Sequence, residues 1–575
     1  MARNGAVAEA TRTREREGVG VDSAGEERLT AWLRARSVPL IVGLLVAVGL
    51  VLRWRAAEVL TMQVDEPATL LAAIAVAERG LPILPSGTLY LHGTVVSYLL
   101  APLVWLGYDG LADLDVLRLV NVAIGCVAIY LTYRLGWLVT GSSWLALLAA
   151  AFLAFDPVSI QWSANIRMYA LLQALTVGLA WVFLRALVQA PGERWRALAA
   201  FVTLFWLATF THPGAVLLWP PLVLVALFLL NGFPFGRHRD LAATFVLSAL
   251  APVLLAGLNV LFGPEPRTVR GSVSGSLLAS DSFLQMETLI RPSISVWRSL
   301  FRNDYFAGLM PELLTICSGL LIGRCFLGAA ATTDRVDRPA VGALLCLFWL
   351  PILEIGFFTS ESQSRYVLNI YPFGLILTAL AVGILGHRGW AAGTAWRDAW
   401  APRIAALAAV AIIMANLIQG LVARFDNPIT DPDYAAAMDF IVEWRGADDP
   451  VVVPLPAPAY LALGDRTHLR FLAGPAESVR TWSYALPADD GRLVDYWVGA
   501  DAITSTRQLC ELLTSRSDTW LVVDQYRLLT AFAGPMATVI LGLTAPVYED
   551  PSGVRVLRPT NRQSRTADAR LMCGL

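Results

Sequence analysis

Apolar runs of helical length dominate the first 425 residues of the chain. Eleven of these runs predict membrane spans, because a helix needs roughly 20 mostly apolar residues to cross a bilayer. They lie near 38–52, 115–138, 143–157, 168–189, 196–211, 214–230, 240–262, 308–328, 340–358, 367–386 and 403–424. Two shorter apolar stretches, at about 67–79 and 94–107, carry charges or a proline, and they predict helices on or partly in the outer membrane surface.

The pattern changes at the end of the last run. Short β-type runs and helical patterns then alternate, with β-type runs at Val451–Leu455, Trp520–Asp524, Thr538–Leu541 and Val554–Leu557 and helical patterns at 432–446 and 505–516. We therefore expect a transmembrane domain over 38–425 and an α/β domain over 426–575. The polar stretch 1–37 has no apolar core of a signal peptide and predicts a disordered cytoplasmic tail.

Arginines orient the predicted spans. With the N-terminus in the cytoplasm, the connections at about 139–142, 190–195, 231–239, 329–339 and 387–402 all lie inside. These connections and their flanks are rich in arginine, as the positive-inside rule requires, and counting 94–107 as a further span would reverse this. An odd number of spans places the C-terminal domain outside the cytoplasm. A bacterial plasma membrane is the expected location.

Composition agrees with a membrane protein. Of the 575 residues, 56% are apolar and 15% are charged, whereas soluble proteins carry about 25% charged residues. The mean hydropathy is +0.58. This excludes a disordered chain, a disulfide-dense secreted domain and a typical nucleic-acid binder, and the net charge of −1 gives no attraction to polyanions. Membrane lipids are therefore expected partners, and nucleic acid is not.

Two features of composition bear on the candidate residues. The chain has no lysine, so all 44 basic residues are arginine, and an arginine at one position is weaker evidence for phosphate recognition than usual. Cys510 and Cys573 both fall in the predicted outer domain. A disulfide between them in an oxidising compartment stays open, and no Cys/His spacing indicates a structural zinc site.

The first outer loop, 53–114, holds the first candidate chemistry. Asp65 and Glu66 precede Pro67 at a predicted helix start. They are either a helix cap with a solvated neighbour, or a general base or metal-binding carboxylate at the mouth of a cavity. His92 in the same loop is a weaker candidate for binding.

Other outer segments add residues of both charges. Arg167 and Tyr169 stand where the chain re-enters the membrane, with Asp156 at the end of the preceding span. They are either interfacial residues or pocket residues. His212, in Thr211-His212-Pro213-Gly214, is either a proton shuttle or metal ligand, or an interfacial hydrogen-bonding residue.

Two further outer loops complete the set. The loop 263–307 is long and rich in Gly and Ser, and it contains Glu287 and Arg291; it is either a mobile lid or a connector. Arg365 and Tyr366 lie at the entry of a later span, where a guanidinium suits two phosphate oxygens. Acids and arginines from five outer segments thus converge on one face, as an enzyme that handles a lipid-linked phosphate requires.

At these residues the sequence resembles the GT-C superfamily of membrane glycosyltransferases, in particular the protein O-mannosyltransferase and aminoarabinose-transferase branch. The resemblance rests on the order and spacing of Asp65-Glu66, Asn165–Tyr169, Thr211–Gly214 and Ser364–Tyr366 with Tyr371-Pro372, and it covers about 38–424. It implies a polytopic α-helical membrane protein with a C-terminal extracytoplasmic α/β domain. It also implies an enzyme that takes a sugar from a polyprenyl-phosphate donor and passes it to a hydroxyl acceptor.

The resemblance assigns roles to the candidates. Asp65 is then the catalytic base or a metal-facing carboxylate, and Arg365 holds the donor phosphate. Residues expected to line the pocket are Glu66, His92, Arg167, Tyr169, His212, Glu287, Arg291 and Tyr366. Relatives often have a second acid where this chain has Asn165 and Arg167, and this departure argues against a divalent-metal mechanism. If a metal does bind, Asp65 and Asp156 are the residues expected to hold it.

The expected reaction is a single displacement that inverts the anomeric centre. Asp65 deprotonates the acceptor hydroxyl, and the polyprenyl phosphate leaves beside Arg365. The alternative is a non-catalytic carrier or flippase for lipid-linked sugars, although such proteins place charges near the bilayer midplane, where most of these spans have none. A ligase or lipid-modifying transferase that uses the same face is a third interpretation.

Overall fold

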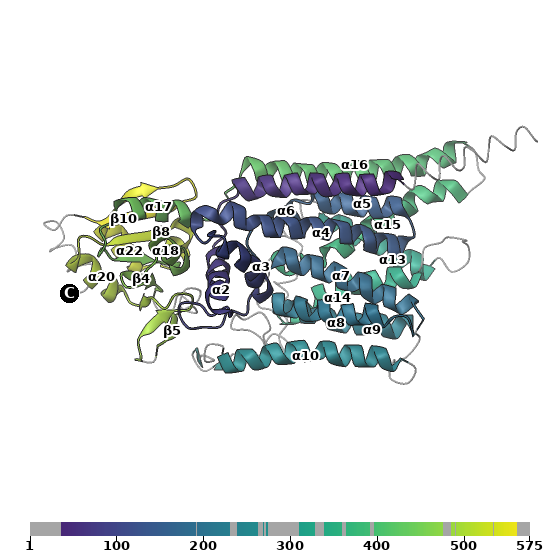
Figure 1. The fold of residues 1–575 in the computed structure, drawn as a ribbon. Coiled ribbons are helices and arrows are strands. Elements are labelled where there is room, and N and C mark those ends of the chain that lie inside the picture. Colours follow the sequence, from purple (N-terminus) through teal and green to yellow (C-terminus); the bar gives the residue numbers. More distant parts are fainter. Residues whose placement is uncertain are drawn as a thin grey trace, which may run out of the picture.

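A bundle of helices joins an α/β domain at one end (Figure 1). The computed structural model describes residues 36–190, 192–230, 238–262, 268–269, 272–273, 310–327, 338–358, 364–391, 396–429, 431–474, 485–488, 490–532 and 534–560. The predicted tail up to residue 35, Glu287, Arg291 and Cys573 lie outside the described residues. Most of the loop 263–307 does so too.

The bundle consists of long apolar helices whose bounds follow the predicted runs. They are Arg36–Val59, α4 (Leu114–Thr140), α5 (Ser143–Phe155), α6 (Pro157–Ser163), α7 (Tyr169–Val188), α8 (Trp195–Thr211), α9 (Trp219–Leu229), α10 (Arg239–Phe262), α13 (Met310–Leu327), α14 (Arg338–Phe358), α15 (Tyr371–Ala391) and α16 (Trp396–Asp426). Helix α4 packs against α5 and α7, and α15 packs against α5, α13, α14 and α16. Arg36–Val59 runs beside α16 (Figure 1).

Five of the described helices are long and apolar enough to cross a membrane by themselves. They are Arg36–Val59, Leu111–Thr140, Tyr169–Val188, Arg239–Asn259 and Arg403–Asp426. Helices α5 and α6 form a sixth candidate that bends by 61° at Asp156. Each of the eleven predicted runs falls on a helix, and the chain is an integral membrane protein. The count of eleven spans stays a prediction, because the other apolar helices are shorter.

Helices α2 (Glu66–Arg79) and α3 (Thr94–Trp105) lie across one end of the bundle, between it and the α/β domain (Figure 1). We call this end of the bundle the capped end. Pro67 fits the first turn of α2 because its missing N–H is not needed there. Gly80 ends the helix in the left-handed conformation, at φ 77°, and its N–H bonds to the carbonyl of Val76.

The C-terminal domain is built on an eight-stranded sheet with the order β5-β6-β7-β4-β3-β8-β10-β9. The strands are β3 (Val451–Val453), β4 (Leu469–Leu472), β5 (Ala485–Pro487), β6 (Leu493–Asp495), β7 (Asp501–Ile503), β8 (Trp520–Asp524), β9 (Thr544–Glu549) and β10 (Val554–Pro559). The four central strands β7, β4, β3 and β8 are parallel, and the flanking pairs are antiparallel. Separately, β1 (Thr268–Val269) pairs with β2 (Ser272–Val273).

Helices cover both faces of this sheet. Val451 and Val453 belong to a core shared with α17 (Tyr434–Trp444) and α18 (Pro456–Leu463). Val452 belongs instead to a core shared with α20 (Thr506–Ser515) and α22 (Pro535–Leu543). Alternate residues of one strand point to opposite faces, so the domain has three layers.

The sequence-based elements of this domain are partly right. The expected strands at Val451, Trp520 and Val554 and the expected helices near 432–446 and 505–516 are present. The strand predicted at Thr538–Leu541 is wrong, because this run lies within α22. Val539 and Ile540 pack with Met536 and Leu543 in the core under the sheet, and this packing outweighs the β preference of the run.

The two parts of the molecule share one apolar core and several polar contacts. Leu70 in α2 belongs to the same buried cluster as Val451 and Tyr434 of the C-terminal domain. The N–H of Ser86 donates to the carbonyl of Trp497 at 3.3 Å, and a guanidinium of Arg466 donates to the carbonyl of Pro85 at 3.1 Å. The domain is therefore docked on the capped end.

Of the two cysteines of this domain, the structure describes Cys510. Cys510 in α20 is buried and disulfide-bonded. Cys573 lies outside the described residues, so whether it is the partner stays open.

Candidate active site

Asp65 lies at the N-terminus of α2 but does not cap it. Its side chain makes no capping hydrogen bond and is 31% exposed. Gln63 shapes the turn instead: its side-chain oxygen accepts from the N–H of Asp65 at 2.9 Å, and its N–H donates to Glu66 Oε2 at 2.8 Å. The carboxylate of Asp65 is therefore available to other segments of the chain.

Two arginines from distant segments pair with this carboxylate. Arg365 Nη1 lies 3.1 Å from Asp65 Oδ2, and Arg167 Nη2 lies 3.5 Å from the same oxygen. Arg365 belongs to the 3-10 turn η3 (Ser364–Tyr366), and Arg167 to the loop before α7. We call Asp65, Arg167 and Arg365 the open cluster. The structure thus brings together three residues that the sequence placed on one face.

The loop that carries Arg167 is held by its backbone. Asn121 in α4 donates from Nδ2 to the carbonyls of Asn165 and Arg167, the latter at 2.7 Å. The N–H of Ile166 donates to Glu66 Oε1 at 2.6 Å. Both supporting side chains are buried. The loop before α7 and the start of α2 are therefore fixed relative to each other. This preorganises the open cluster.

Arg167 also makes neutral hydrogen bonds. Its Nη1 donates to the carbonyl of Asp65 at 3.2 Å, to Thr69 Oγ1 at 3.0 Å and to the Tyr90 hydroxyl at 3.0 Å. The side chain is only 7% exposed. Arg167 is therefore not a snorkelling residue at the membrane surface, and it presents a fixed positive charge to the site.

Arg365 sits among three aromatic rings. Its guanidinium carbon lies 5.9 Å from the ring centre of Trp162 and 5.7 Å from those of Tyr169 and Tyr366. Trp162 and Tyr169 pack edge to face at 4.8 Å. Cation–π attraction and the rigid rings hold the guanidinium in place without neutralising its charge.

The electrostatics favour an ionised acid and charged arginines. Burial raises the pKa of Asp65, but Arg167 and then Arg365 lower it, and the net pKa lies below its usual range. The pKa of Arg365 is raised overall, because its interactions with Tyr169, Asp65 and Tyr366 outweigh burial. The open cluster therefore holds two guanidinium groups for one carboxylate, an excess of positive charge suited to an anion.

His212 lies beside these rings. It begins the 3-10 turn η2 (Pro213–Leu218), and its Nδ1 accepts from the N–H of Gly214 at 2.9 Å. Its ring lies 5.7 Å from Tyr169 and 6.5 Å from Tyr366. Burial, with His92, Arg167 and Arg365 nearby, lowers its pKa well below the usual value. His212 is therefore neutral, with its remaining proton on Nε2.

Glu66 faces away from this cluster. It is fully buried, and Arg118 in α4 donates to Oε1 at 3.0 Å and to Oε2 at 2.7 Å. Together with the N–H groups of Gln63 and Ile166, these bonds give each oxygen two donors. We call Glu66 and Arg118 the closed pair. This geometry gives Glu66 a structural role, and the role in substrate binding predicted for it would require breaking these bonds.

Asp156 has a local role as well. It is buried at the bend between α5 and α6, and its Oδ2 accepts from the N–H of Ser159 at 2.6 Å. It therefore caps α6. No described contact joins it to Asp65.

The described donors do not fit a divalent metal. Within the described ranges, no group of three or more His, Cys, Asp or Glu side chains lies close enough to hold one. Asp65 is occupied by two arginines, and Asp156 by the start of α6. The alternative of a metal held by Asp65 and Asp156 stays open.

Sequence reasoning missed several residues of the site. Tyr90, Asn121 and Arg118 hold the two clusters together, and Asp431 lies within electrostatic range of Asp65 and Arg365. Arg118 had a signal, since a charge inside a predicted span usually has a buried partner. The others lie in segments whose approach to Asp65 no local spacing reveals. Glu287 and Arg291 lie outside the described residues.

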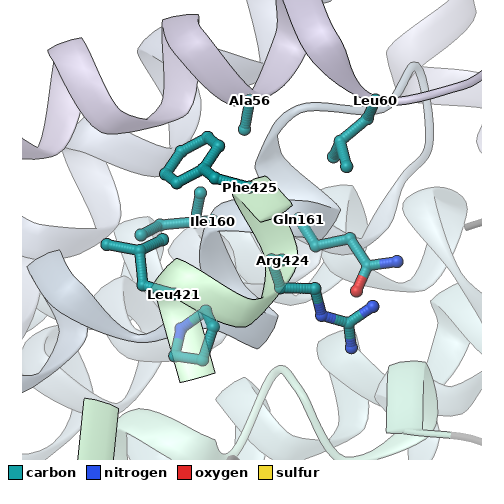
Figure 2. Close-up of a pocket in the computed structure, with 8 residues that line it drawn as sticks. Ala56, Leu60, Ile160, Gln161, Leu421, Arg424 and Phe425 are labelled. Carbon is teal, nitrogen blue, oxygen red and sulfur yellow. The ribbon is translucent and has the colours of Figure 1, made fainter. Parts of the chain in front are cut away.

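A small pocket lies beside the site, between the first helix, α6 and α16. Its walls are apolar apart from Gln161 and Arg424 (Figure 2). The lining residues are Ala56, Leu60, Pro157, Ile160, Gln161, Leu421, Arg424 and Phe425. Residues of α6 line this pocket, and the same helix carries Trp162, one of the rings around Arg365. No member of the open cluster lines it.

The architecture of this chain is similar to that of proteins of known structure. No family model matches the chain, and no curated protein matches it in sequence. Solved structures do match in three dimensions. ArnT from Cupriavidus metallidurans in the apo state is 15% identical with a TM-score of 0.53, and the match covers 90% of this chain and 97% of ArnT.

A second similar structure is the archaeal oligosaccharyltransferase AglB from Archaeoglobus fulgidus, in complex with an inhibitory peptide and a dolichol-phosphate. It is 12% identical with a TM-score of 0.54, over 94% of this chain and 78% of AglB. ArnT bound to undecaprenyl phosphate matches with a TM-score of 0.51 at 14% identity, over 90% of this chain and 97% of ArnT. These neighbours are GT-C glycosyltransferases, so the resemblance found in the sequence is confirmed at the level of the fold: the chain has the GT-C architecture.

Proposed function

We propose that this protein is a membrane glycosyltransferase of the GT-C type. It moves a sugar from a polyprenyl-phosphate-linked donor to a hydroxyl group of a lipid, glycan or protein acceptor on the extracytoplasmic face. The reaction is a single displacement with inversion at the anomeric carbon.

One observation carries the proposal: Asp65 and Arg365, 300 residues apart in sequence, meet at 3.1 Å in a partly exposed cluster. An ionised carboxylate beside two fixed guanidinium groups offers both functions that the reaction needs. The arginines bind the anionic phosphate, and the carboxylate accepts a hydrogen bond from the acceptor hydroxyl.

The transfer then uses the residues as follows. The donor phosphate takes the place of Asp65 as a partner of Arg365 and Arg167, which leaves Asp65 facing the acceptor. The acceptor oxygen attacks the anomeric carbon as its O–H bond breaks toward Asp65. The bond from the anomeric carbon to the phosphate oxygen breaks, and the phosphate keeps the electron pair, steadied by Arg365.

The solved neighbours support the class of donor. ArnT is bound to undecaprenyl phosphate in one of these structures, and AglB to a dolichol-phosphate in another. Both ligands are polyprenyl-type phosphates. An excess of positive charge in the open cluster is what such a group would bind.

The test uses purified full-length protein in detergent with a polyprenyl-phosphate monosaccharide and a panel of hydroxyl acceptors. We expect Asp65→Asn and Arg365→Ala each to lower the transfer rate by about 10²-fold or more. Matched controls are Glu58→Gln and Arg55→Ala, which alter an exposed ion pair on the first helix and should leave transfer unchanged.

Three results would reject the proposal. The first is near-wild-type transfer by Asp65→Asn, and the second is a product that retains the donor's anomeric configuration. The third is movement of lipid-linked sugar across vesicle membranes without any transfer, which would favour the carrier or flippase.

Sidedness is tested separately. We place the N-terminus in the cytoplasm of a bacterial cell and the C-terminal domain outside it. Asp465→Cys, in the C-terminal domain, should react with an impermeant maleimide added to intact cells, and Glu193→Cys, at the opposite end of the bundle, should react only after lysis. The reverse pattern would overturn this orientation.

A further inference from the structure

Gln173 is a fully buried polar residue of the apolar helix α7. Its Nε2 donates to the carbonyl of Leu368 at 2.8 Å and to Ser159 Oγ at 3.3 Å. Leu368 lies in the turn between η3 and α15, 195 residues further along the chain, and Ser159 lies in α6. A single amide group therefore joins three elements: α6, α7 and the turn that follows Arg365.

These are the elements that surround Arg365. Trp162 belongs to α6, Tyr169 to α7 and Tyr366 to η3, and the Arg365 guanidinium lies close to all three rings. Gln173 follows Tyr169 by four residues, so both side chains lie on the same face of α7. Gln173 thus fixes the elements that carry the rings relative to one another.

Helix α6 is held from its other side as well. Ser163 Oγ donates to the carbonyl of Ser159 at 2.6 Å, and Arg53 Nε donates to Ser163 Oγ at 3.3 Å. Arg53 is fully buried on the first helix, and its remaining N–H groups donate to the carbonyls of Gly49, Leu153 and Ala154. Gln173 therefore connects a firmly held helix to the turn after Arg365.

Stability alone does not account for a glutamine at this position. Its Oε1 is buried and has no hydrogen-bond partner among the described residues. A buried amide oxygen without a partner lowers the stability of the fold. An apolar side chain of similar length would avoid this effect, but it could donate neither to Leu368 nor to Ser159.

We propose that Gln173 is a positioning residue of the transferase: it holds the turn after Arg365 and so keeps the Arg365 guanidinium among its rings and beside Asp65. This inference rests on the proposed function. Gln173 touches no substrate in this proposal and acts through Arg365, which steadies the departing phosphate. A group displaced by about 1 Å loses much of its effect on the transition state.

The first test needs no activity. Phenylglyoxal modifies guanidinium groups, and peptide mass spectrometry follows its reaction with Arg365, whose side chain is 18% exposed, in the purified full-length protein. Gln173→Met keeps the length of the side chain but loses both N–H donors. We expect Arg365 to react about fivefold faster in this variant, the factor by which one net hydrogen bond changes an opening equilibrium.

The matched control for this test is Thr176→Val on the same helix. Thr176 is fully buried, and its Oγ1 has no hydrogen-bond partner within the described ranges. Arg365 should react in Thr176→Val at the wild-type rate. Equal rates in the wild type and in Gln173→Met would overturn the proposal.

The second test measures transfer. We expect Gln173→Met to lower kcat by about tenfold without a change in the KM of the acceptor. In an Arg365→Lys background the same substitution should lower kcat by less than about twofold, because the planar group that Gln173 positions is already gone. A merely structural residue would lower kcat by the same factor in both backgrounds, and that result would reject action through Arg365.

A second variant keeps the test decisive if Gln173→Met does not fold. Ser159→Ala removes one acceptor of the Gln173 amide and leaves the backbone bonds of Ser159 in place. We expect Arg365 to react with phenylglyoxal about twofold faster in this variant. An unchanged rate would count against the proposal.

The two tests separate this inference from the proposed function. Transfer by the wild type, together with equal modification rates, rejects the role of Gln173 and leaves the transferase in place. A wild-type protein that transfers no sugar rejects the proposed function and any role of Gln173 in transfer. Faster modification in Gln173→Met would then still support the part of the inference that concerns the position of Arg365.

Discussion

Asp65 and Glu66 are neighbours in the chain, but their carboxylates belong to different kinds of ion pair. In the closed pair, Glu66 is fully buried, and its two oxygens accept four hydrogen bonds, two of them from Arg118. In the open cluster, Asp65 is 31% exposed, and a single oxygen faces both arginines.

Two neighbouring acids at the start of α2 thus have different roles: Glu66 stabilises the fold, and Asp65 has the proposed role in transfer. The closed pair ties α4 to the start of α2 and leaves no acceptor unused. The open cluster has more positive than negative charge, and the side chains of Asp65 and Arg365 are partly exposed. An ion pair whose hydrogen-bonding groups are all occupied stabilises the fold. An ion pair with groups left unoccupied is able to exchange a partner for substrate.

The largest effect is expected from breaking the closed pair. Arg118→Leu leaves the Glu66 carboxylate buried without its cation, and we expect the free energy of unfolding to fall by about 3–5 kcal/mol. The measurement is denaturant unfolding in detergent, followed by tryptophan fluorescence. Arg365→Leu, in the partly exposed cluster, should cost about 1 kcal/mol.

A double variant sharpens this test. Glu66→Leu with Arg118→Leu removes both charges, so most of the lost stability should return. If Arg118→Leu and Arg365→Leu destabilise the protein equally, the distinction between the closed pair and the open cluster is wrong.

The next effect concerns activity in the open cluster. Arg365→Lys keeps the charge but loses the planar fork that stacks among Trp162, Tyr169 and Tyr366. We expect transfer to fall by about 10²-fold, with little change in stability. Donor titrations at fixed acceptor concentration measure the loss, and Arg55→Lys on the exposed pair is the control.

Full activity of Arg365→Lys would mean that a positive charge at this position is enough for donor binding. The three rings around Arg365 would then have no part in it. A loss seen only in the KM of the acceptor would move Arg365 to the acceptor side of the site.

The sequence predicts the helices of the bundle because apolar runs of this length have few alternatives in a membrane protein. It does not predict the bend of 61° at Asp156, although Asp156-Pro157 was visible as a break. Short strands such as β4 and β7 were missed, since three or four residues carry little pattern, and their pairing depends on distant partners.

For the site, charge and predicted sidedness were enough to place Asp65, Arg167 and Arg365 on one face. They were not enough to separate Asp65 from Glu66, because the partner of Glu66 is 52 residues away in α4. The effect of Asp65 and Arg365 on the pKa of Asp431 was not predictable either, because it depends on how the C-terminal domain docks.

The smallest effect is expected at another buried acid, Glu354, which fits neither kind of ion pair. Glu354 in α14 is 9% exposed, and its Oε2 has no hydrogen-bond partner among the described residues. A buried carboxylate without partners costs stability when it is ionised. We therefore expect Glu354→Gln to be neutral or to stabilise the protein by up to about 1 kcal/mol, measured by the same unfolding titration.

Glu66→Gln is the informative counterpart, because it removes the same charge from a saturated pair and should destabilise the protein instead. Opposite signs for these two isosteric changes would show that partners, and not burial alone, make an acid structural. If Glu354→Gln leaves stability unchanged but abolishes transfer, Glu354 belongs functionally with the open cluster. A full set of hydrogen-bond partners would then still identify a structural acid. Solvent exposure of the carboxylate would no longer be needed to identify a functional acid.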